Sequence, residues 1–297
     1  MSKIWLGRIL FRLIYLAVIL TLNVFRVKKA QLEVIMKHIN LFIVVTVLML
    51  WGSIAHGAVV TRTISYQENG VSLQGYLAYD NDLKGKRPGV LVVHEWWGLN
   101  DYARKRARQL ADLGYVAFAL DMYGKDKVAD HPDQAREFMK EVTTNVNSWQ
   151  KRALAGLAVL KKQSVTDSSR IAAIGYCFGG STVQQLAYSG ADIRGIVSFH
   201  GSLISPMESA AKHTKAKILI CHGAADPFTK PEALQAYLTA MNASSLDWKM
   251  VIYAHAKHAF TNPDADKHGM AALGYNPIVD RRSWEDMKQF FNEIFSN

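Results

Sequence analysis

The stretch IAAIGYCFGGSTVQQLAY, residues 171–188, decides how the rest of the chain is interpreted. Its first four residues form a short apolar run, which is typical of a buried parallel strand. Residues 181–188 can form a helix, and the turn between the two segments carries Cys177 with glycines on both sides. A strand, a sharp glycine-flanked turn and a helix form the elbow that presents a nucleophilic side chain above a sheet. This chain has cysteine there, where serine is usual.

The glycines of this elbow have a steric reason. A strained backbone at the central residue brings its neighbours so close to the adjoining strand and helix that side chains there would collide. Cys177 would lie near the positive end of the following helix, whose dipole favours the thiolate. The backbone N–H of Phe178 would be one oxyanion donor. The alternative is a glycine-rich turn around a buried structural cysteine, because free cysteine is among the most buried residue types.

Strand and helix patterns alternate from residue 89 onward, which predicts a doubly wound, mostly parallel sheet with helices on both faces. Residues 58–66 and 71–79 are predicted to form antiparallel N-terminal strands joined at the hairpin dipeptide Asn69-Gly70. The predicted strands are 89–93, 115–120, 171–174, 194–199, 217–221 and 248–253, and the predicted helices are 101–113, 133–142, 147–161, 181–188, 231–241 and 282–295. Without internal repeats or low-complexity linkers, residues 58–297 are expected to form one catalytic domain.

Functional residues of such sheets lie in loops beyond the carboxyl ends of the strands. Asp226 and His258 each follow a predicted strand after Cys177, so nucleophile, acid and histidine come in the order expected for this kind of elbow. In these roles His258 would transfer the protons of Cys177 and of the leaving group, and Asp226 would orient the imidazole. Alternatively, Asp226 and the following proline form only a turn and helix cap, or His255 takes the place of His258.

Glu95 follows the strand 89–93 and is itself followed by Trp96 and Trp97. Apolar walls would raise the pKa of this carboxyl and let it hold or accept a proton. The sequence has ten histidines but no metal-ligand spacing such as H-E-x-x-H, so no metal and no other cofactor is expected. The second cysteine, Cys221, lies in a buried-strand pattern and is expected to be a small core residue.

The N-terminal region, residues 1–57, differs in composition from the remainder. It holds seven of the 35 Lys and Arg residues but one of the 25 Asp and Glu residues, so much of the formal charge of +10 lies there. The rest of the chain has no basic run interleaved with aromatic residues, so nucleic-acid binding is not expected.

Residues 36–57 are typical of a secretory signal peptide. They have a basic start, an apolar core over residues 41–51, and small residues at Ala55 and Gly57 before a cleavage site. We therefore expect export to the periplasm or the medium, with Met36 as the biological start. The alternative is an uncleaved membrane anchor, and the N-terminus is the one part expected to contact a membrane.

Five ordered motifs resemble those of the dienelactone hydrolase family, which has the α/β-hydrolase fold. They are His94-Glu95-Trp96-Trp97-Gly98, Asp121-Met122-Tyr123-Gly124, the elbow at 175–180, His222-Gly223 with Asp226-Pro227, and His258-Ala259-Phe260-Thr261-Asn262-Pro263. The resemblance covers residues 60–297 and implies a triad of Cys177, Asp226 and His258. It also implies an oxyanion hole from the backbone N–H groups of Trp96 and Phe178. The elbow cysteine of the family rests against a glutamate that matches Glu95 and takes the thiol proton when substrate binds.

The substrate pocket is expected to be walled by aromatic residues, including Trp97 and Tyr123. The best-known family members hold a substrate carboxylate with two arginines, where this chain has Lys125 and Asn262. Lysine is a point charge without the bidentate fork of arginine. The resemblance implies hydrolysis of a small-molecule carboxylic ester or lactone, as by a carboxymethylenebutenolidase, through an acyl-Cys intermediate. Two alternatives remain: an exported, non-catalytic small-molecule-binding protein of this fold, and acyl transfer or peptide cleavage by the same residues.

Overall fold

The computed structural model describes residues 59–296, together with residues 16, 17, 19–21, 31, 33 and 36–38. The chain divides into two units, Met1–His56 and Gly57–Asn297. The predicted signal peptide, its cleavage site and the anchor alternative fall almost wholly outside the described residues and stay predictions. Among the residues that are described, none of the helices has the length and apolar character needed to cross a membrane.

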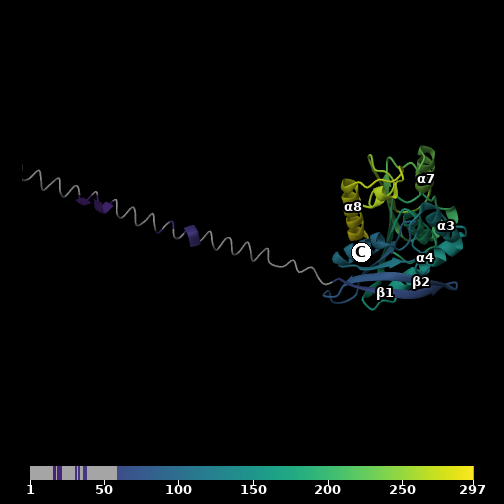
Figure 1. Cartoon of the computed structure of the whole chain (residues 1–297), viewed down its shortest axis with the longest axis horizontal. Helices are drawn as coiled ribbons and strands as arrows, with labels where there is room; N and C mark the ends of the chain where they lie inside the picture. The colour runs from purple at the N-terminus through teal and green to yellow at the C-terminus, as the bar shows by residue number, and fades with distance from the viewer. Residues whose placement is uncertain are drawn as a thin grey trace, which may run out of the picture. The chain divides into compact units, whose positions relative to one another are not determined.

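Within residues 59–296, eight strands form one sheet in the spatial order β1-β2-β4-β3-β5-β6-β7-β8. Figure 1 shows β1 and β2 side by side. β1 and β2 pair antiparallel, as do β2 and β4, whereas all neighbours from β4 to β8 pair parallel. The strands are β1 (Val59–Glu68), β2 (Val71–Asp80), β3 (Arg87–Val93), β4 (Val116–Leu120), β5 (Thr166–Tyr176), β6 (Gly195–Phe199), β7 (Lys217–Gly223) and β8 (Trp248–Tyr253). The predicted mostly parallel sheet with antiparallel N-terminal strands is confirmed.

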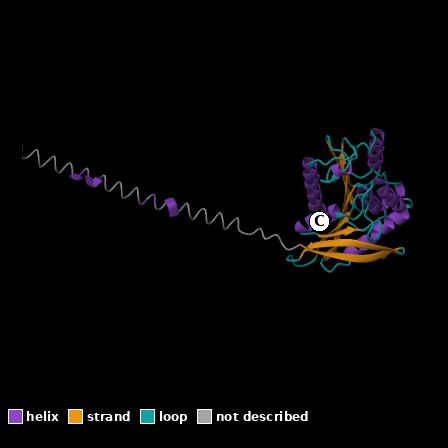
Figure 2. Cartoon of the chain, viewed as in Figure 1, coloured by secondary structure: helices purple, strands orange, loops and turns teal. Residues whose placement is uncertain are grey.

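Helices cover both faces of this sheet (Figure 2). They are α2 (Asp101–Asp112), α3 (Pro132–Thr143), α4 (Val146–Lys161), α5 (Phe178–Tyr188), α6 (Glu208–His213), α7 (Pro231–Ala243) and α8 (Pro277–Phe295), with the 3₁₀ helix η1 (Ala265–His268). Side chains alternate along β3, so that Leu91 and Val93 belong to the core beneath α4 and α5, whereas Val90 and Val92 belong to the core beneath α2 and α8. Two apolar layers therefore hold the sheet rigidly between helices.

Two large shifts of a boundary and one additional helix distinguish the structure from the prediction. α8 begins at Pro277, five residues early, because the Asn276 side chain accepts hydrogen bonds from the N–H groups of Ile278 and Val279 and proline suits the first helical turn. β5 begins at Thr166, since its polar start pairs with the start of β3 across an irregularity in register. The six-residue helix α6 was not predicted, because its length gives too few turns for a periodic signal.

The parallel strands bring the functional loops together at one edge of the sheet. β5 and β6 pair Tyr176 with Phe199, and β6 and β7 pair Phe199 with Cys221, so these strands end nearly in step. The residues that follow each strand, including Cys177, therefore emerge side by side. This is the edge at which sheets of this kind bind ligands.

Candidate active site

The elbow at Cys177 has the strained geometry expected of it. Cys177 has φ 54° and ψ −117° and directly precedes the first residue of α5. A Cβ atom built on Gly175 would lie 2.0 Å from the Gly179 carbonyl oxygen, and one built on Gly179 would lie 2.2 Å from the carbonyl oxygen of Val93. Both obstacles are backbone atoms that cannot swing away, so the glycines are required by close approach, as predicted.

The structure brings the side chains of Cys177, His258 and Asp226 together. His258 Nδ1 lies 2.8 Å from Asp226 Oδ2, and His258 and Cys177 line the same cavity, where the sulfur influences the titration of the imidazole. The other carboxylate oxygen of Asp226 accepts the N–H of Phe228 at 2.9 Å. Both oxygens of this buried carboxylate are thus engaged, which orients it toward the imidazole. His255, the rival histidine, is exposed, whereas His258 is buried.

The electrostatics of His258 follow from these contacts. Burial by itself would lower the pKa of His258, but the negative charge on the sulfur of Cys177 and the hydrogen bond with Asp226 outweigh it and raise the pKa to about 10. The imidazolium form is therefore the stable one beside a thiolate. Such a pair is the activated state of a cysteine nucleophile.

Glu95 is buried at the end of β3, and its Oε2 accepts a hydrogen bond from Asn262 Nδ2 at 2.6 Å. Burial raises the pKa of Glu95 to about 7, although the Asn262 hydrogen bond and the positive charges of His258 and Arg106 oppose this rise. The predicted perturbation is confirmed. Family resemblance implies that this glutamate rests against the cysteine, whereas the hydrogen-bond partner of Glu95 in this structure is Asn262.

The two residues expected to supply oxyanion donors, Trp96 and Phe178, both line the cavity over Cys177. Phe178 is the first residue of α5, so its N–H has no acceptor within the helix. Trp96 follows Glu95 after β3, and both Trp96 and Phe178 line the same cavity as Cys177 and His258. Acyl transfer needs backbone donors of this kind where the oxyanion forms.

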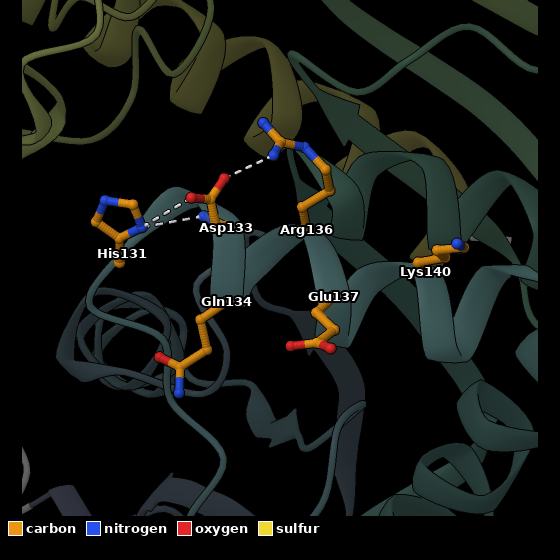
Figure 3. Close-up of a pocket in the computed structure, with 6 residues that line it drawn as sticks. All are labelled: His131, Asp133, Gln134, Arg136, Glu137 and Lys140. Carbon is orange, nitrogen blue, oxygen red and sulfur yellow. Dashed lines mark hydrogen bonds and ion pairs between the residues drawn. The ribbon is translucent and has the colours of Figure 1, made fainter.

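The cavity over Cys177 has a volume of about 490 Å³ and mostly apolar walls. Helices α3 and α4, the elbow and the loops after β6, β7 and β8 supply its lining: Trp96, Arg136, Met139, Thr143, Trp149, Cys177, Phe178, Ser181, Ser202, Ile204, Phe228, His258, Met270 and Leu273. Arg136 also borders a second hollow on the outer face of α3, where it bonds to Asp133 at 2.7 Å (Figure 3).

The three predicted pocket residues lie away from this lining. Trp97 is buried and stacks on His268, with ring centroids 3.9 Å apart. Tyr123 is buried against Phe178, behind the cavity wall. Lys125 is exposed. The two aromatic residues thus support the wall from behind, and the actual wall comes in large part from α3, α4 and later loops.

Three further buried residues adjoin the elbow without having been singled out from the sequence as functional: Tyr102, Arg106 and Thr261, all hydrogen-bonded around His200. His200 was recognisable as a strand-end residue, but the position alone assigned it no role. Within the described part of the chain, no cluster of three or more His, Cys, Asp or Glu side chains is arranged to hold a metal ion.

The sheet, its helices and the elbow together define an α/β-hydrolase fold. Comparison with protein families narrows this class: the model of the dienelactone hydrolase family matches residues 73–295, and the chain belongs to that family. It is a dienelactone hydrolase-like enzyme that acts on a carboxylic ester or lactone.

Relatives of known structure or name agree with this assignment. The solved structure of m3DLH is 41% identical, with a TM-score of 0.78 over 80% of this chain and 100% of that one. A dienelactone hydrolase-like promiscuous phosphotriesterase from metagenomic libraries is 37% identical, with a TM-score of 0.77 over 80% and 99%. A protein of Aquifex aeolicus, provisionally named a carboxymethylenebutenolidase, is 27% identical over 235 residues, which are 77% of this chain and 97% of that protein.

Proposed function

We propose that this enzyme hydrolyses its substrate through an acyl-Cys intermediate, with Cys177 as nucleophile, His258 as acid and base, and Asp226 as the residue that orients the imidazole. The observation that carries the proposal is that Cys177 of the strained elbow and His258 line one cavity, and that His258 lies within hydrogen-bond distance of the buried Asp226 carboxylate. The order of the three residues along the chain is also the one that this fold uses.

In the first half-reaction the thiolate attacks the carbonyl carbon and forms a C–S bond. The backbone N–H groups of Trp96 and Phe178 stabilise the oxyanion of the tetrahedral intermediate. The C–O bond then breaks, and His258 gives its proton to the departing alkoxide. In the second half-reaction His258 takes a proton from water, and the hydroxide attacks the thioester. The C–S bond breaks, the acid leaves, and the thiolate–imidazolium pair returns.

The cavity supports an uncharged, largely apolar substrate. Apart from His258, the lining residue with a charge is Arg136, whose side chain is 63% exposed and paired with Asp133. Lys125 lies elsewhere, and Asn262 is bonded to Glu95. A carboxylate placed in this cavity would lose water, and the buried cation in the lining, His258, is already paired with Asp226, so the placement is costly.

Two matched esters test the substrate class: 4-nitrophenyl hexanoate and 4-nitrophenyl hydrogen adipate, which differ by a terminal carboxylate. We expect kcat/KM to be at least about tenfold higher for the hexanoate, because the adipate carboxylate is desolvated without a partner. Equal or higher kcat/KM for the adipate would contradict the proposed class of substrate.

Cys177→Ala tests the mechanism, with Cys221→Ala as the matched control. Cys221 is fully buried in β7, and burial raises its pKa to about 12, so it is not a nucleophile. We expect Cys177→Ala to lose turnover by about 10³-fold or more and Cys221→Ala to retain it. Full activity of Cys177→Ala would exclude the acyl-Cys route. A wild-type protein that binds esters without turnover would favour the non-catalytic alternative.

A second candidate activity is cleavage of neutral phosphotriesters. The observation that favours it is the 37% identity to a dienelactone hydrolase-like promiscuous phosphotriesterase. The Cys177 thiolate would attack phosphorus, an S–P bond would form, the aryl oxide would leave, and water would then break the S–P bond. Release of 4-nitrophenolate from paraoxon by the wild type, and its loss in Cys177→Ala, are the expected results. No release above the rate in buffer would exclude this activity.

We also propose that the chain is exported, because residues 36–57 have the basic, apolar and small-residue order of a signal peptide. N-terminal sequencing of the mature protein is expected to begin at Ala58. A mature protein that begins at Met1 or Met36 would support the membrane-anchor alternative.

A further inference from the structure

A buried imidazole lies beneath the elbow and plays no part in the proton transfers described above. His200 directly follows β6, is completely buried, and has a positive φ of 41°. It is the next residue after Phe199, which pairs with Tyr176, so His200 and Cys177 face each other just beyond the ends of two paired strands. Both residues have backbone conformations that persist only where the surroundings enforce them.

His200 contacts the backbone of the candidate nucleophile directly. Its Nδ1 accepts the N–H of Cys177 at 3.1 Å, a hydrogen that is shared with the carbonyl of Phe199 at 3.0 Å. Because Nδ1 accepts a hydrogen bond from an N–H, it carries no proton, and Nε2 must carry the proton of the neutral ring. Nε2 then donates to Thr261 Oγ1 at 2.6 Å. The tautomer of His200 is therefore set from both sides.

Thr261 is held in its turn by two buried groups. Its hydroxyl lies 2.7 Å from the hydroxyl of Tyr102, and its carbonyl accepts a hydrogen bond from Arg106 at 2.7 Å. Arg106 also donates to Asp280 of α8 at 2.5 Å. Thr261 lies three residues after His258 and directly before Asn262. The contacts that hold Thr261 therefore also restrain the loop that carries these two residues.

We propose that His200 is a positioning residue that fixes the Cys177 elbow relative to the loop carrying His258 and Asn262, using its two ring nitrogens as the two ends of a clamp. One nitrogen holds the nucleophile's backbone, and the other holds the loop that carries the acid–base residue. The inference rests on the proposed function in that Cys177 and His258 are taken to react together.

The clamp has to remain uncharged. Burial, and then the positive charges of His258 and Arg106 nearby, hold the pKa of His200 well below its usual value. The rings of His200 and His258 meet edge to face with centroids 5.3 Å apart. A second cation there would repel the His258 imidazolium and would replace the Nδ1 acceptor by a donor facing the N–H of Cys177. A neutral imidazole is thus suited to both contacts.

The sharpest test uses Thr261, which touches the clamp but not the cavity. Thr261→Val removes the acceptor of His200 Nε2 at nearly constant volume, and Thr261→Ser keeps that acceptor. Thr166→Val is the matched control, because Thr166 is equally buried on β5 but its hydroxyl has no hydrogen-bond partner. The readouts are kcat and KM for 4-nitrophenyl hexanoate and the rate of Cys177 alkylation by iodoacetamide.

We expect Thr261→Val to lower kcat by about tenfold or more with little change in KM, because small displacements of reacting groups cost up to about 100-fold. Thr261→Ser is expected to recover most of this loss, and Thr166→Val to leave kcat within about twofold of wild type, since it alters no contact of the reacting groups. If Thr261→Val and Thr261→Ser both match Thr166→Val, or if Val and Ser at position 261 lower kcat equally, the clamp is refuted.

A second pair of variants tests the other end of the clamp. Asn at position 200 can present Oδ1 where His200 presents Nδ1, whereas Leu cannot accept a hydrogen bond. We expect the Cys177 alkylation rate to stay closer to wild type in His200→Asn than in His200→Leu, and equal rates in the two variants would overturn the proposal. Should Cys177→Ala retain turnover, the proposed function fails, but the Cys177 alkylation rates in the two His200 variants still decide on the clamp.

Discussion

Replacing Glu95 with glutamine should make the protein more stable at neutral and basic pH while impairing it as an enzyme. Glu95 is buried, and Asn262 supplies its hydrogen bond at 2.6 Å. Glutamine has nearly the same shape and can accept that bond through its own carbonyl oxygen, but it cannot ionise. The variant therefore separates the charge of Glu95 from its packing.

The magnitude follows from the pKa of the group. Burial raises the pKa of Glu95 from 4.5 to about 7, so between these pH values the folded protein keeps a proton that the unfolded chain has lost. The stability that protonated Glu95 supports is complete below pH 4.5 and is lost as the pH rises through 7. With about 1.4 kcal/mol for each pKa unit, the loss is about 3 kcal/mol at pH 8 and less than about 1 kcal/mol at pH 5.

Urea denaturation followed by tryptophan fluorescence at pH 5, 6, 7 and 8 measures this effect. The difference in unfolding free energy between Glu95→Gln and wild type should grow by about 2–3 kcal/mol in favour of the variant between pH 5 and pH 8. Turnover of 4-nitrophenyl hexanoate should fall in the same variant, because a proton acceptor next to the reacting groups is gone. A pH-independent difference in stability would show that Glu95 does not titrate near neutrality and would refute the reasoning.

Three other predictions concern the elbow and the imidazole. Gly179→Ala should yield no soluble folded protein, because the new Cβ would lie 2.2 Å from the Val93 carbonyl oxygen, whereas Gly274→Ala, which meets the flexible side chain of Lys257 at 3.2 Å, should stay soluble. Asp226→Asn should lower kcat by about 10³–10⁴-fold with little loss of fold, since the charge that stabilises the imidazolium is removed; a kcat within tenfold of wild type would argue against the triad. In stopped-flow experiments the acylation burst should persist above the pH at which a free histidine loses its proton, because the raised pKa of His258 keeps its ring protonated. A burst that is lost near pH 7 would contradict this raised pKa.

The elbow and the order of the triad were predictable because each depends on local sequence. A short apolar strand, flanking glycines and a following helix force one backbone geometry at Cys177, whatever the rest of the chain does. Asp226 and His258 follow predicted strands, and parallel strands place their carboxyl ends at one edge. The sheet order itself then brings the three residues to the same side without any knowledge of side-chain packing.

The walls of the cavity were not predictable in this way. Trp149, Met139 and Phe228 reach the cavity from α4, α3 and the loop after β7, and which face a helix turns to the sheet depends on how all its neighbours pack. Trp97 looked like a pocket residue because it follows a strand near Glu95, but its ring stacks on His268 instead. Position along the chain thus identifies a loop but not the direction of each of its side chains.

The partner of Glu95 illustrates the same limit. Asn262 lies 167 residues further along the chain, and no local pattern connects the two. The resemblance to the family showed that Asn262 stands where the best-known members have an arginine, which suggested a change in substrate recognition. The contact between Asn262 and Glu95 adds a second consequence. Asn262 gives the buried Glu95 carboxyl a hydrogen bond but, unlike arginine, no full positive charge, so burial can raise the pKa of Glu95.

The two proposed half-reactions need opposite protonation states of His258, which would act as an acid in the first and as a base in the second. A negative charge on the sulfur of Cys177 is the first of the influences that raise the pKa of His258 against the effect of burial, so beside a thiolate the ring holds the proton that a leaving alkoxide would require. In the proposed mechanism, acylation would remove this charge from sulfur. Burial then opposes only the contribution of Asp226, the pKa of His258 falls, and the ring becomes the base that hydrolysis of the thioester requires. The proposed acyl-Cys intermediate would therefore convert its own acid into a base, and the loss of charge from sulfur on acylation is what would make this conversion possible.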